Sequence, residues 1–372
     1  MTNVPRMMMA AAGTGGSPTG LYAFGKNTSG ELGLGNTTSY SSPVQVGSST
    51  DWTSITAGRD ARSGAINSSN EAYVWGAGSG GALGLGNTTD YSLPVQLGAA
   101  IWLNLKFGSG NGSIISTAYK LYTWGKRNDR GQQAHGNTTL YSSPVQVGAL
   151  TDWLSGGTGG DSNDNMRWIK TDGTLWSAGY RQYVGDSQNA ADRSSPVQIG
   201  ALTTWVKVAT SSGNGAAIAY RSDGTLWAFG RNLSGALGLD DETNRSSPVQ
   251  IGALTTWRDV AVNSQHGGGV NSSGELFMWG NGSDGRLGLG NTTSYSSPVK
   301  VGSLTNWSKV YCADKSTIVK KTDGTAWAFG INDTGQLGLG NLTAYSSPVQ
   351  IGTETSWSKI SIGREHTLAI MA

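Results

Sequence analysis

Hydrophobic residues fall in short runs in which large side chains alternate with small or polar ones, as in Leu226–Gly230 (LWAFG). This alternation is typical of a β-strand, because successive side chains of a strand point to opposite faces. Asp-Gly pairs at Asp172–Gly173, Asp223–Gly224 and Asp323–Gly324 precede such runs and favour tight turns between strands. Since no window shows helical periodicity with capping residues, we predict an all-β fold.

Three markers recur at intervals of about fifty residues and in a constant phase. A glycine after a small or aromatic residue occurs at Gly25, Gly76, Gly125, Gly179, Gly230, Gly280 and Gly330. A proline within SPV or LPV occurs at Pro43, Pro94, Pro144, Pro196, Pro248, Pro298 and Pro348. A tryptophan occurs at Trp52, Trp102, Trp153, Trp205, Trp257, Trp307 and Trp357. Seven units of four short strands predict a seven-bladed β-propeller of four-stranded blades, with the proline strand at a strand start or a blade edge.

The two ends of the chain hold complementary parts of one unit. The chain enters the pattern at Leu21–Gly25, and it leaves after Trp357–Ile370, which supplies the half-unit that is missing at the start. We therefore predict that the N-terminal and C-terminal half-repeats share one blade, because this closure leaves no unpaired strand edge. The propeller is predicted to comprise residues 21–372.

Residues 1–20 contain no repeat marker and are rich in Met, Ala and Gly. We predict that they form a leader or anchor arm outside the propeller that becomes ordered only against a partner, with Met7, Met8 and Met9 as candidate anchor residues. A disordered tail is the alternative. The apolar run in this segment is shorter than the core of a secretory signal, and no window of the chain approaches the length of a membrane-spanning helix.

Charged residues make up 13% of the chain, and the formal net charge is +2 with no basic or acidic blocks. A nucleic-acid groove needs clustered Lys and Arg to neutralise phosphates, so we expect no nucleic-acid partner. The one cysteine, Cys312, excludes an intramolecular disulfide and is predicted to be a small buried residue.

Longer strings within the units resemble the regulator of chromosome condensation repeat family. They are FGKNTSGELGLGN from Phe24 and FGINDTGQLGLGN from Phe329, then SSPVQ, a W-x-K-V/I strand and G-x-x-H-T-x-A-I at Gly363–Ile370. The resemblance covers about residues 21–372 and implies a seven-bladed propeller with shared-blade closure. Members of that family include a guanine-nucleotide exchange factor for a small GTPase, a plant ultraviolet photoreceptor, ubiquitin-ligase modules and a bacterial inhibitor of β-lactamases. Because these functions differ on one fold, the resemblance implies only binding through loops on one propeller face.

Catalysis needs a nucleophile, a base and an orienting group in one cleft, and the sequence shows no such set. Two of the three histidines, His266 and His366, stand nine residues after the repeat tryptophan, where a local hydrogen-bonding role is expected. The polar loop Gly159–Asn165 lacks the oxygen spacing and the closing Glu of a calcium loop. No G-x-x-x-x-G-K-S/T phosphate loop occurs. We therefore predict no enzyme activity, no cofactor and no metal site.

The repeats differ most in the segment that follows each tryptophan strand. In a propeller these seven segments form a ring of loops near one mouth of the central channel. A recognition ring is predicted from their polar and charged members, which are Arg59, Asp60, Asn111, Asp161, Asn214, His266, Lys315, Arg364 and Glu365. Mixed signs of charge favour a protein or glycan partner over a phosphate polymer. Sequence drift in solvent-exposed loops is the alternative for any single residue.

The repeats are more alike than those of the eukaryotic members, with LGLGNTTSYSSPV occurring at both Leu32 and Leu287. This uniformity and the low charge are similar to phage and marine bacterial versions of the family. We therefore predict a non-enzymatic structural or attachment protein of a virus particle, a phage head or tail accessory component. It would contact other virion proteins through residues 1–20 and host-surface protein or glycan through the propeller. One alternative is a secreted or surface bacterial propeller that binds or inhibits a protein, and another is an intracellular exchange-factor-like scaffold.

Overall fold

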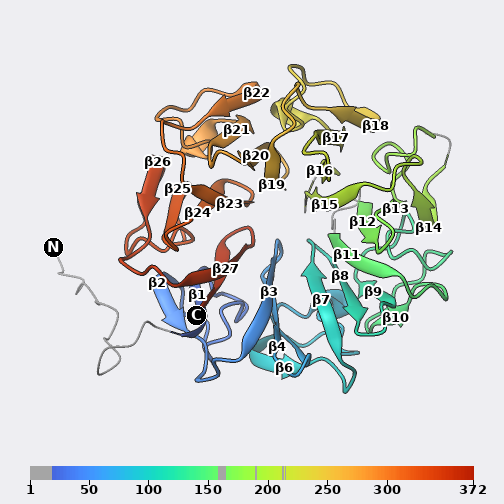
Figure 1. Cartoon of the computed structure of the whole chain (residues 1–372). Helices are drawn as coiled ribbons and strands as arrows, with labels where there is room; N and C mark the ends of the chain where they lie inside the picture. Colours follow the sequence, from blue (N-terminus) through green and yellow to red (C-terminus); the bar gives the residue numbers. More distant parts are fainter. Residues whose placement is uncertain (1–18, 158–164, 189–190, 212, 214) are drawn as a thin grey trace.

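The computed structural model of the chain describes residues 19–157, 165–188, 191–211, 213 and 215–372. Over these residues the backbone forms seven four-stranded sheets, arranged as blades around a central axis (Figure 1). Short 3₁₀ helices η1 (Ser79–Gly81), η2 (Leu233–Gly235) and η3 (Ser283–Gly285) lie in connecting loops. The predicted all-β, seven-bladed propeller is confirmed.

The first four blades follow the order of the chain. Blade 1 has β3 (Trp52–Gly58), β4 (Arg62–Asn67), β5 (Ala72–Gly76) and β6 (Tyr91–Gln96). Blade 2 has β7 (Trp102–Phe107), β8 (Asn111–Ser116), β9 (Leu121–Gly125) and β10 (Val145–Gln146). Blade 3 has β11 (Trp153–Gly157), β12 (Asn165–Lys170), β13 (Leu175–Gly179) and β14 (Arg193–Gln198). Blade 4 has β15 (Trp205–Thr210), β16 (Ala217–Arg221), β17 (Leu226–Gly230) and β18 (Arg245–Gln250).

The last three blades complete the ring. Blade 5 has β19 (Trp257–Val262), β20 (His266–Asn271), β21 (Leu276–Gly280) and β22 (Tyr295–Lys300). Blade 6 has β23 (Trp307–Cys312), β24 (Ser316–Lys321), β25 (Ala326–Gly330) and β26 (Tyr345–Gln350). Blade 7 has β27 (Trp357–Ile362), β28 (His366–Met371), β1 (Gly20–Gly25) and β2 (Tyr40–Gln45).

Blade 7 joins the two ends of the chain. Its strand order is β2-β1-β28-β27, and β1 pairs antiparallel with β28. Leu21 lies opposite Ile370 and Ala23 lies opposite Leu368 in this register. In Figure 1 the blue strands of the N-terminal part therefore lie beside the red strands of the C-terminal part. The predicted shared-blade closure is confirmed.

Within each blade the tryptophan strand is innermost and the proline strand is outermost. Figure 1 shows β3, β7, β15, β19 and β27 around the centre of the ring, and the inner strands of successive blades contact one another. Pro43 lies in the outer strand β2 and Pro94 in the outer strand β6. This agrees with the predicted blade-edge position, because proline has no N–H to give to a further strand.

The direction of the inner strands defines two faces of the ring. The loop face has the connections from the inner to the second strand, such as residues 59–61, and the long connections from the third to the outer strand, such as residues 77–90. The turn face has tight turns between the second and third strands, such as Asp172–Gly173. Asp172 holds its turn by accepting hydrogen bonds at Oδ1 from Thr174 N at 2.9 Å and Thr174 Oγ1 at 2.7 Å.

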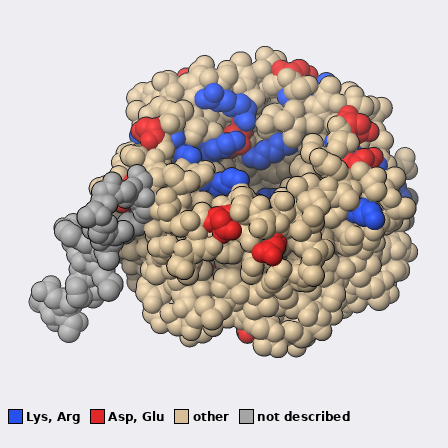
Figure 2. All heavy atoms as spheres, turned by 60° about the horizontal axis from the view of Figure 1, so that its bottom comes forward, with Lys and Arg blue, Asp and Glu red and all other residues tan. Residues whose placement is uncertain are grey.

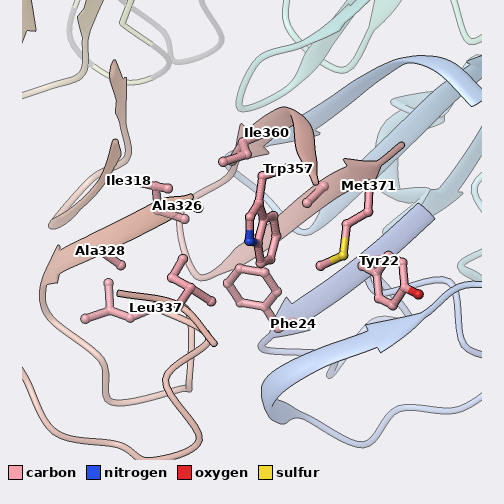
Figure 3. Close-up of a cluster of buried hydrophobic side chains, with 11 residues drawn as sticks. Tyr22, Phe24, Ile318, Ala326, Ala328, Leu337, Trp357, Ile360 and Met371 are labelled. Carbon is pink, nitrogen blue, oxygen red and sulfur yellow. The ribbon is translucent and has the colours of Figure 1, made fainter. Parts of the chain in front are cut away.

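The hydrophobic core lies between neighbouring blades. Figure 3 shows the contact of blades 6 and 7, where Phe24 and Trp357 pack against Ile318 and Leu337. These four side chains are at most 2% exposed, and each contributes about 1.5–3 kcal/mol on full burial. Between blades 5 and 6 the corresponding cluster includes Cys312, which is a buried free thiol as predicted.

Tryptophans of the third strand add hydrogen bonds between blades. Trp75 Nε1 donates to Glu31 O at 3.0 Å, and Trp279 Nε1 donates to Ala236 O at 2.9 Å. In each pair the acceptor belongs to the long loop of the preceding blade. The loops of the loop face are therefore fixed to the next blade as well as to their own.

Candidate interaction surface

Buried asparagines shape the long connections of the loop face. Asn27 is 0% exposed and its Nδ2 donates to Asn36 O and to Thr38 O, both at 3.0 Å. Its Oδ1 accepts a hydrogen bond from Leu32 N at 2.9 Å. Asparagines at the matching position of other repeats, Asn128, Asn232 and Asn332, are equally buried. One side chain thus closes each loop of this type from inside, so these loops form an ordered rim around the shorter inner loops.

Asp314, in the loop between β23 and β24, is the centre of an ion-pair network at the channel mouth of the loop face. Its carboxylate accepts a hydrogen bond from Ser264 Oγ at 2.5 Å and lies 3.3 Å from Arg59 Nη2 and 3.5 Å from Arg364 Nε. Burial alone would raise the pKa of Asp314, but the Ser264 hydrogen bond and the two arginine charges outweigh it and lower the pKa. The side chain is therefore held as a carboxylate that joins blades 1, 5, 6 and 7.

Glu365 extends this network, and Asp60 forms a separate ion pair on the same face. Glu365 lies 2.6 Å from Lys26 Nζ and 3.5 Å from Arg364 Nε. Asp60 lies 3.0 Å from Lys126 Nζ. These pairs are partly exposed, so each adds little stability by itself, but together they fix the orientation of charged groups on this face.

Arg59 reaches across the channel mouth. A Cβ atom on Gly213, in the loop after β15, would stand 2.0 Å from Arg59 Nη1, so the guanidinium lies against that backbone. Arg59 thus extends from blade 1 to blades 4 and 6. A cavity of about 120 Å³ lies beside it, lined by Lys26, Glu31, Arg59, Asp60, Ala61, Arg364, Glu365 and His366.

The structure brings five of the predicted ring residues to the loop face, and these are Arg59, Asp60, Lys315, Arg364 and Glu365. Arg364 is the most exposed member of the ion-pair network, with 47% of its side chain accessible. Lys315 is exposed beside Asp314. Asp161 and Asn214, together with the candidate anchors Met7, Met8 and Met9, lie outside the described residues.

Two members of the predicted ring, Asn111 and His266, do not present their side chains to solvent. Asn111 is 0% exposed, and its amide donates to Arg127 O at 2.8 Å and accepts from Arg127 N at 3.0 Å. His266 is 0% exposed, and its Nε2 lies 3.0 Å from Thr317 Oγ1. Both residues begin second strands and point into the blade contacts, so they support the loops rather than form the outer surface.

The sequence prediction omitted Asp314, Ser264 and Lys26. Asp314 and Ser264 belong to the same variable segments as Lys315 and His266, and the available signal was their position in those segments. Lys26 directly follows the marker glycine Gly25 rather than the tryptophan strand. Nothing in the repeat phase indicates that it meets Glu365 across the β1–β28 pair.

His266 and His366, which occupy the same position in two repeats, each have the local hydrogen-bonding role that this position predicts. His366 Nε2 lies 3.0 Å from Ser63 Oγ of the next blade. Desolvation lowers the pKa of His266 to about 3 and that of His366 to about 4; for His266 the charge of Arg286 lowers it as well, against the opposing effect of Asp314. Both rings are therefore neutral in the folded chain at neutral pH.

We expect the free energy of unfolding to fall as pH falls below about 6.5, because the two imidazoles are protonated in the unfolded chain but not in the fold. Their stabilisation is complete above the unfolded pKa and is lost between about 6.5 and the folded values of about 3 and 4. Each histidine should cost about 1–2 kcal/mol at pH 5. Urea unfolding at pH 7.5 and pH 5 measures this, and His366→Gln should reduce the difference; an identical difference in the variant would contradict the assignment.

Among the residues that the structure describes, no group of three or more His, Cys, Asp or Glu side chains is arranged to hold a metal ion. None of the helices in that part of the chain has the length and apolarity needed to cross a membrane.

A model of the "Regulator of chromosome condensation (RCC1) repeat" matches residues 20–61, 69–106, 223–269, 273–319 and 323–370. Together these five segments cover more than half of the chain. Each of the five segments contains one marker glycine, one marker proline and one marker tryptophan, which are the residues from which the propeller was predicted.

Among curated relatives, the Ultraviolet-B receptor UVR8 of Arabidopsis thaliana is 28% identical over 242 residues, which are 63% of this chain and 54% of the receptor. The E3 ubiquitin-protein ligase HERC2 of Homo sapiens is 27% identical over 251 residues, which are 65% of this chain and 5% of the ligase. The chain thus spans about half the length of the receptor and about a twentieth of the ligase.

Solved structures show the same fold. Human WBSCR16 superposes with a TM-score of 0.83 at 17% identity, covering 95% of this chain and 99% of the other. Prp20p of Saccharomyces cerevisiae superposes with a TM-score of 0.80 at 16% identity, covering 96% of this chain and 93% of the other. At such identities the likeness concerns the arrangement of blades and not the residues of the loop face.

Proposed function

Because the chain belongs to the regulator of chromosome condensation repeat family, we propose that it is a non-catalytic propeller that binds a protein partner through its loop face. The observation that supports this most directly is the ion-pair network around Asp314. It gathers charged groups of several blades on one side of the ring. Prp20p of yeast, which has the same fold, binds Gsp1p and histones and forms a complex with Kap60, so protein binding has a precedent on this fold.

The chemistry of the loop face suits a polar protein surface. Arg59 and Asp314 are mostly buried, at 19% and 13% side-chain exposure, and act as the fixed base of the network. Arg364 and Lys315 extend outward from that base. Since Arg364 is already held by Asp314 and Glu365, its side chain would lose less conformational freedom on binding a partner carboxylate than an unrestrained arginine would.

Alanine at Lys315 and Arg364 together is expected to reduce partner binding at least about tenfold while the melting temperature changes little, because two exposed charged donors are removed. Tagged wild-type chain, this double variant and Lys300→Ala would be used to capture partners from an extract of the source cells. Lys300 is a matched control: it is a partly exposed lysine paired with Glu275 at 2.6 Å, on the outer strand β22.

The same proteins should be recovered with the wild type and with Lys300→Ala, and lost with the double variant. Equal recovery with all three chains would place the interaction elsewhere on the propeller. Absence of any protein enriched by the wild type would contradict a protein-binding role.

A more specific prediction is that the chain is a virion protein, namely a phage head or tail accessory component. It rests on the near-identical repeats and the low charge content of 13%. The matched relatives named above are cellular proteins, and none of them supports a virion location. Density-gradient purification of particles from the source tests it, since a virion component must be recovered at fixed stoichiometry with the particles. Recovery only as free protein would favour the two alternatives, a secreted or surface bacterial propeller that binds or inhibits a protein and an intracellular exchange-factor-like scaffold.

A further inference from the structure

The inner strands form the wall of the central channel, and side chains of one blade cap the open backbone of the next. Phe107 N donates to Thr56 Oγ1 at 3.2 Å, and Ala57 N donates to Ser361 Oγ at 2.8 Å. Each acceptor stands four positions after its repeat tryptophan. An inner strand has no neighbour on its axial side, so its free N–H groups need such partners. Side chains at this position, and at the position two residues earlier, therefore lie along the channel wall.

In four blades one of these two positions is a lysine: Lys106 in β7, Lys207 in β15, Lys309 in β23 and Lys359 in β27. Lys207 and Lys309 have 41% and 51% of their side chains exposed. Figure 2 shows basic side chains gathered around the hollow at the centre of the ring, while acidic side chains there are few. Because the four lysines occupy inner-strand positions of separate blades, they surround the axis instead of forming a stripe on the outer surface.

Asp259 is the one acidic residue at these two positions of the seven inner strands. It is 1% exposed, and its Oδ1 lies 2.8 Å from Lys207 Nζ and 3.3 Å from Lys309 Nζ. Its Oδ2 accepts a hydrogen bond from Val310 N at 3.0 Å. Four ammonium groups against one carboxylate leave three positive charges on the channel wall, and the carboxylate oxygens are already engaged.

The remaining two lysines differ in what they contact. Lys359 Nζ donates to Thr53 O of the next blade. Lys106 is half-buried and has no hydrogen-bond or ion-pair partner among the described residues. The pKa of Lys106 is lowered to about 8, first by desolvation within the channel and then by the positive charges of Lys207 and Lys359. Lysines of blades 2, 4 and 7 thus act on one another across the channel.

We propose that the central channel is a binding site for a compact, multivalent oxyanion of the phosphate type, held by Lys106, Lys207, Lys309 and Lys359. Lysine ammonium groups bind phosphate oxygens as point charges, and their mutual repulsion is relieved when an anion of charge −2 or more lies between them. Convergence on the axis of a closed ring suits a compact ion, whereas an extended nucleic acid needs a basic stripe or groove. This site is separate from the loop face and does not depend on a protein partner.

Inorganic pyrophosphate is the probe, and isothermal titration with the full chain at constant ionic strength is the measurement. We expect one binding site in the wild type, and a dissociation constant at least about tenfold higher in Lys106→Met and in Lys309→Met. Lys309→Met changes a half-exposed side chain, so it provides the test if Lys106→Met does not fold. Lys315→Met on the loop face is the matched control and should bind like the wild type.

A second readout concerns stability without the anion. Lys106→Met removes an unpaired charge that its neighbours repel, so it should unfold at the same temperature as the wild type or higher, and pyrophosphate should no longer raise that temperature. Equal affinity in wild type and both channel variants would overturn the proposal, as would loss of binding in Lys315→Met alone. It would also be overturned if hexaglutamate binds but pyrophosphate does not, since the channel mouth would then accept an acidic protein segment.

Discussion

Deleting residues 357–372, which form β27 and β28, is expected to abolish the cooperative unfolding transition of the propeller. These strands provide the inner half of blade 7. They contain five large apolar side chains that are at most 6% exposed, namely Trp357, Ile360, Leu368, Ile370 and Met371. At about 1.5–3 kcal/mol each, their burial amounts to on the order of 10 kcal/mol. That is comparable to the whole stability of a typical domain, about 5–15 kcal/mol.

The deletion also opens the ring. β1 would lose the partner with which it pairs from Gly20 to Gly25, and β23 and β3 would lose the inner strand that lies between blades 6 and 1. Unpaired strand edges and an exposed core surface favour aggregation as well as unfolding. Thermal melts followed by circular dichroism, with gel filtration of the same samples, measure both effects.

Removal of residues 1–18 provides the control, because β1 begins at Gly20 and the leader is predicted to lie outside the propeller. This shorter deletion should leave the midpoint and the sharpness of the transition unchanged. A chain without residues 357–372 that still melts cooperatively at the wild-type temperature would show that the seventh blade is dispensable.

The fold could be predicted because each marker residue suits one local environment of the blade, and that environment recurs in all seven blades. A proline such as Pro43 fits only where no further strand pairs, and a tryptophan such as Trp357 fits where two blades meet. Such requirements depend on a few neighbouring residues, so the phase of the markers gives the blade count. The closure followed from the same phase, since the half-unit at each end is incomplete alone.

The contacts of the candidate surface could not be predicted to the same extent. Arg59 and Asp314 meet although 255 positions separate them in the chain, and their meeting depends on the curvature of the closed ring. Position in a loop segment also does not tell whether a side chain faces outward. His266 and Asn111 occupy the ring segments and yet point into the blades. The imidazole of His266 bonds to the Thr317 hydroxyl, and the amide of Asn111 bonds to the backbone of Arg127.

The marker glycine couples this surface to the blades, and its replacement tests that coupling. Gly280 has φ +96°, and a Cβ atom on it would stand 2.4 Å from Gln265 O and 2.6 Å from His266 Cα. Gln265 O is the acceptor of a hydrogen bond from Asn281 N at 2.8 Å. The same bond follows the marker in other blades, from Lys26 N to Glu365 O and from Ile331 N to Lys315 O.

Gly280→Ala is therefore expected to lower the free energy of unfolding by about 3–5 kcal/mol, because the methyl group collides with backbone and the residue must hold a φ that L-residues rarely adopt. Gly302→Ala is the matched control in the same blade: Gly302 has φ +59°, and a Cβ atom there would meet nothing within 4 Å. In Gly302→Ala only the left-handed backbone conformation is unfavourable, so the free energy of unfolding should fall by about 1–2 kcal/mol. Urea unfolding of both variants measures the difference. Equal losses of unfolding free energy in the two variants would mean that a glycine is needed at position 280 only for its positive φ. A larger loss in Gly280→Ala would show that the glycine also leaves room for the hydrogen bond from Asn281 N to Gln265 O, which joins the long loop to the loop between β19 and β20.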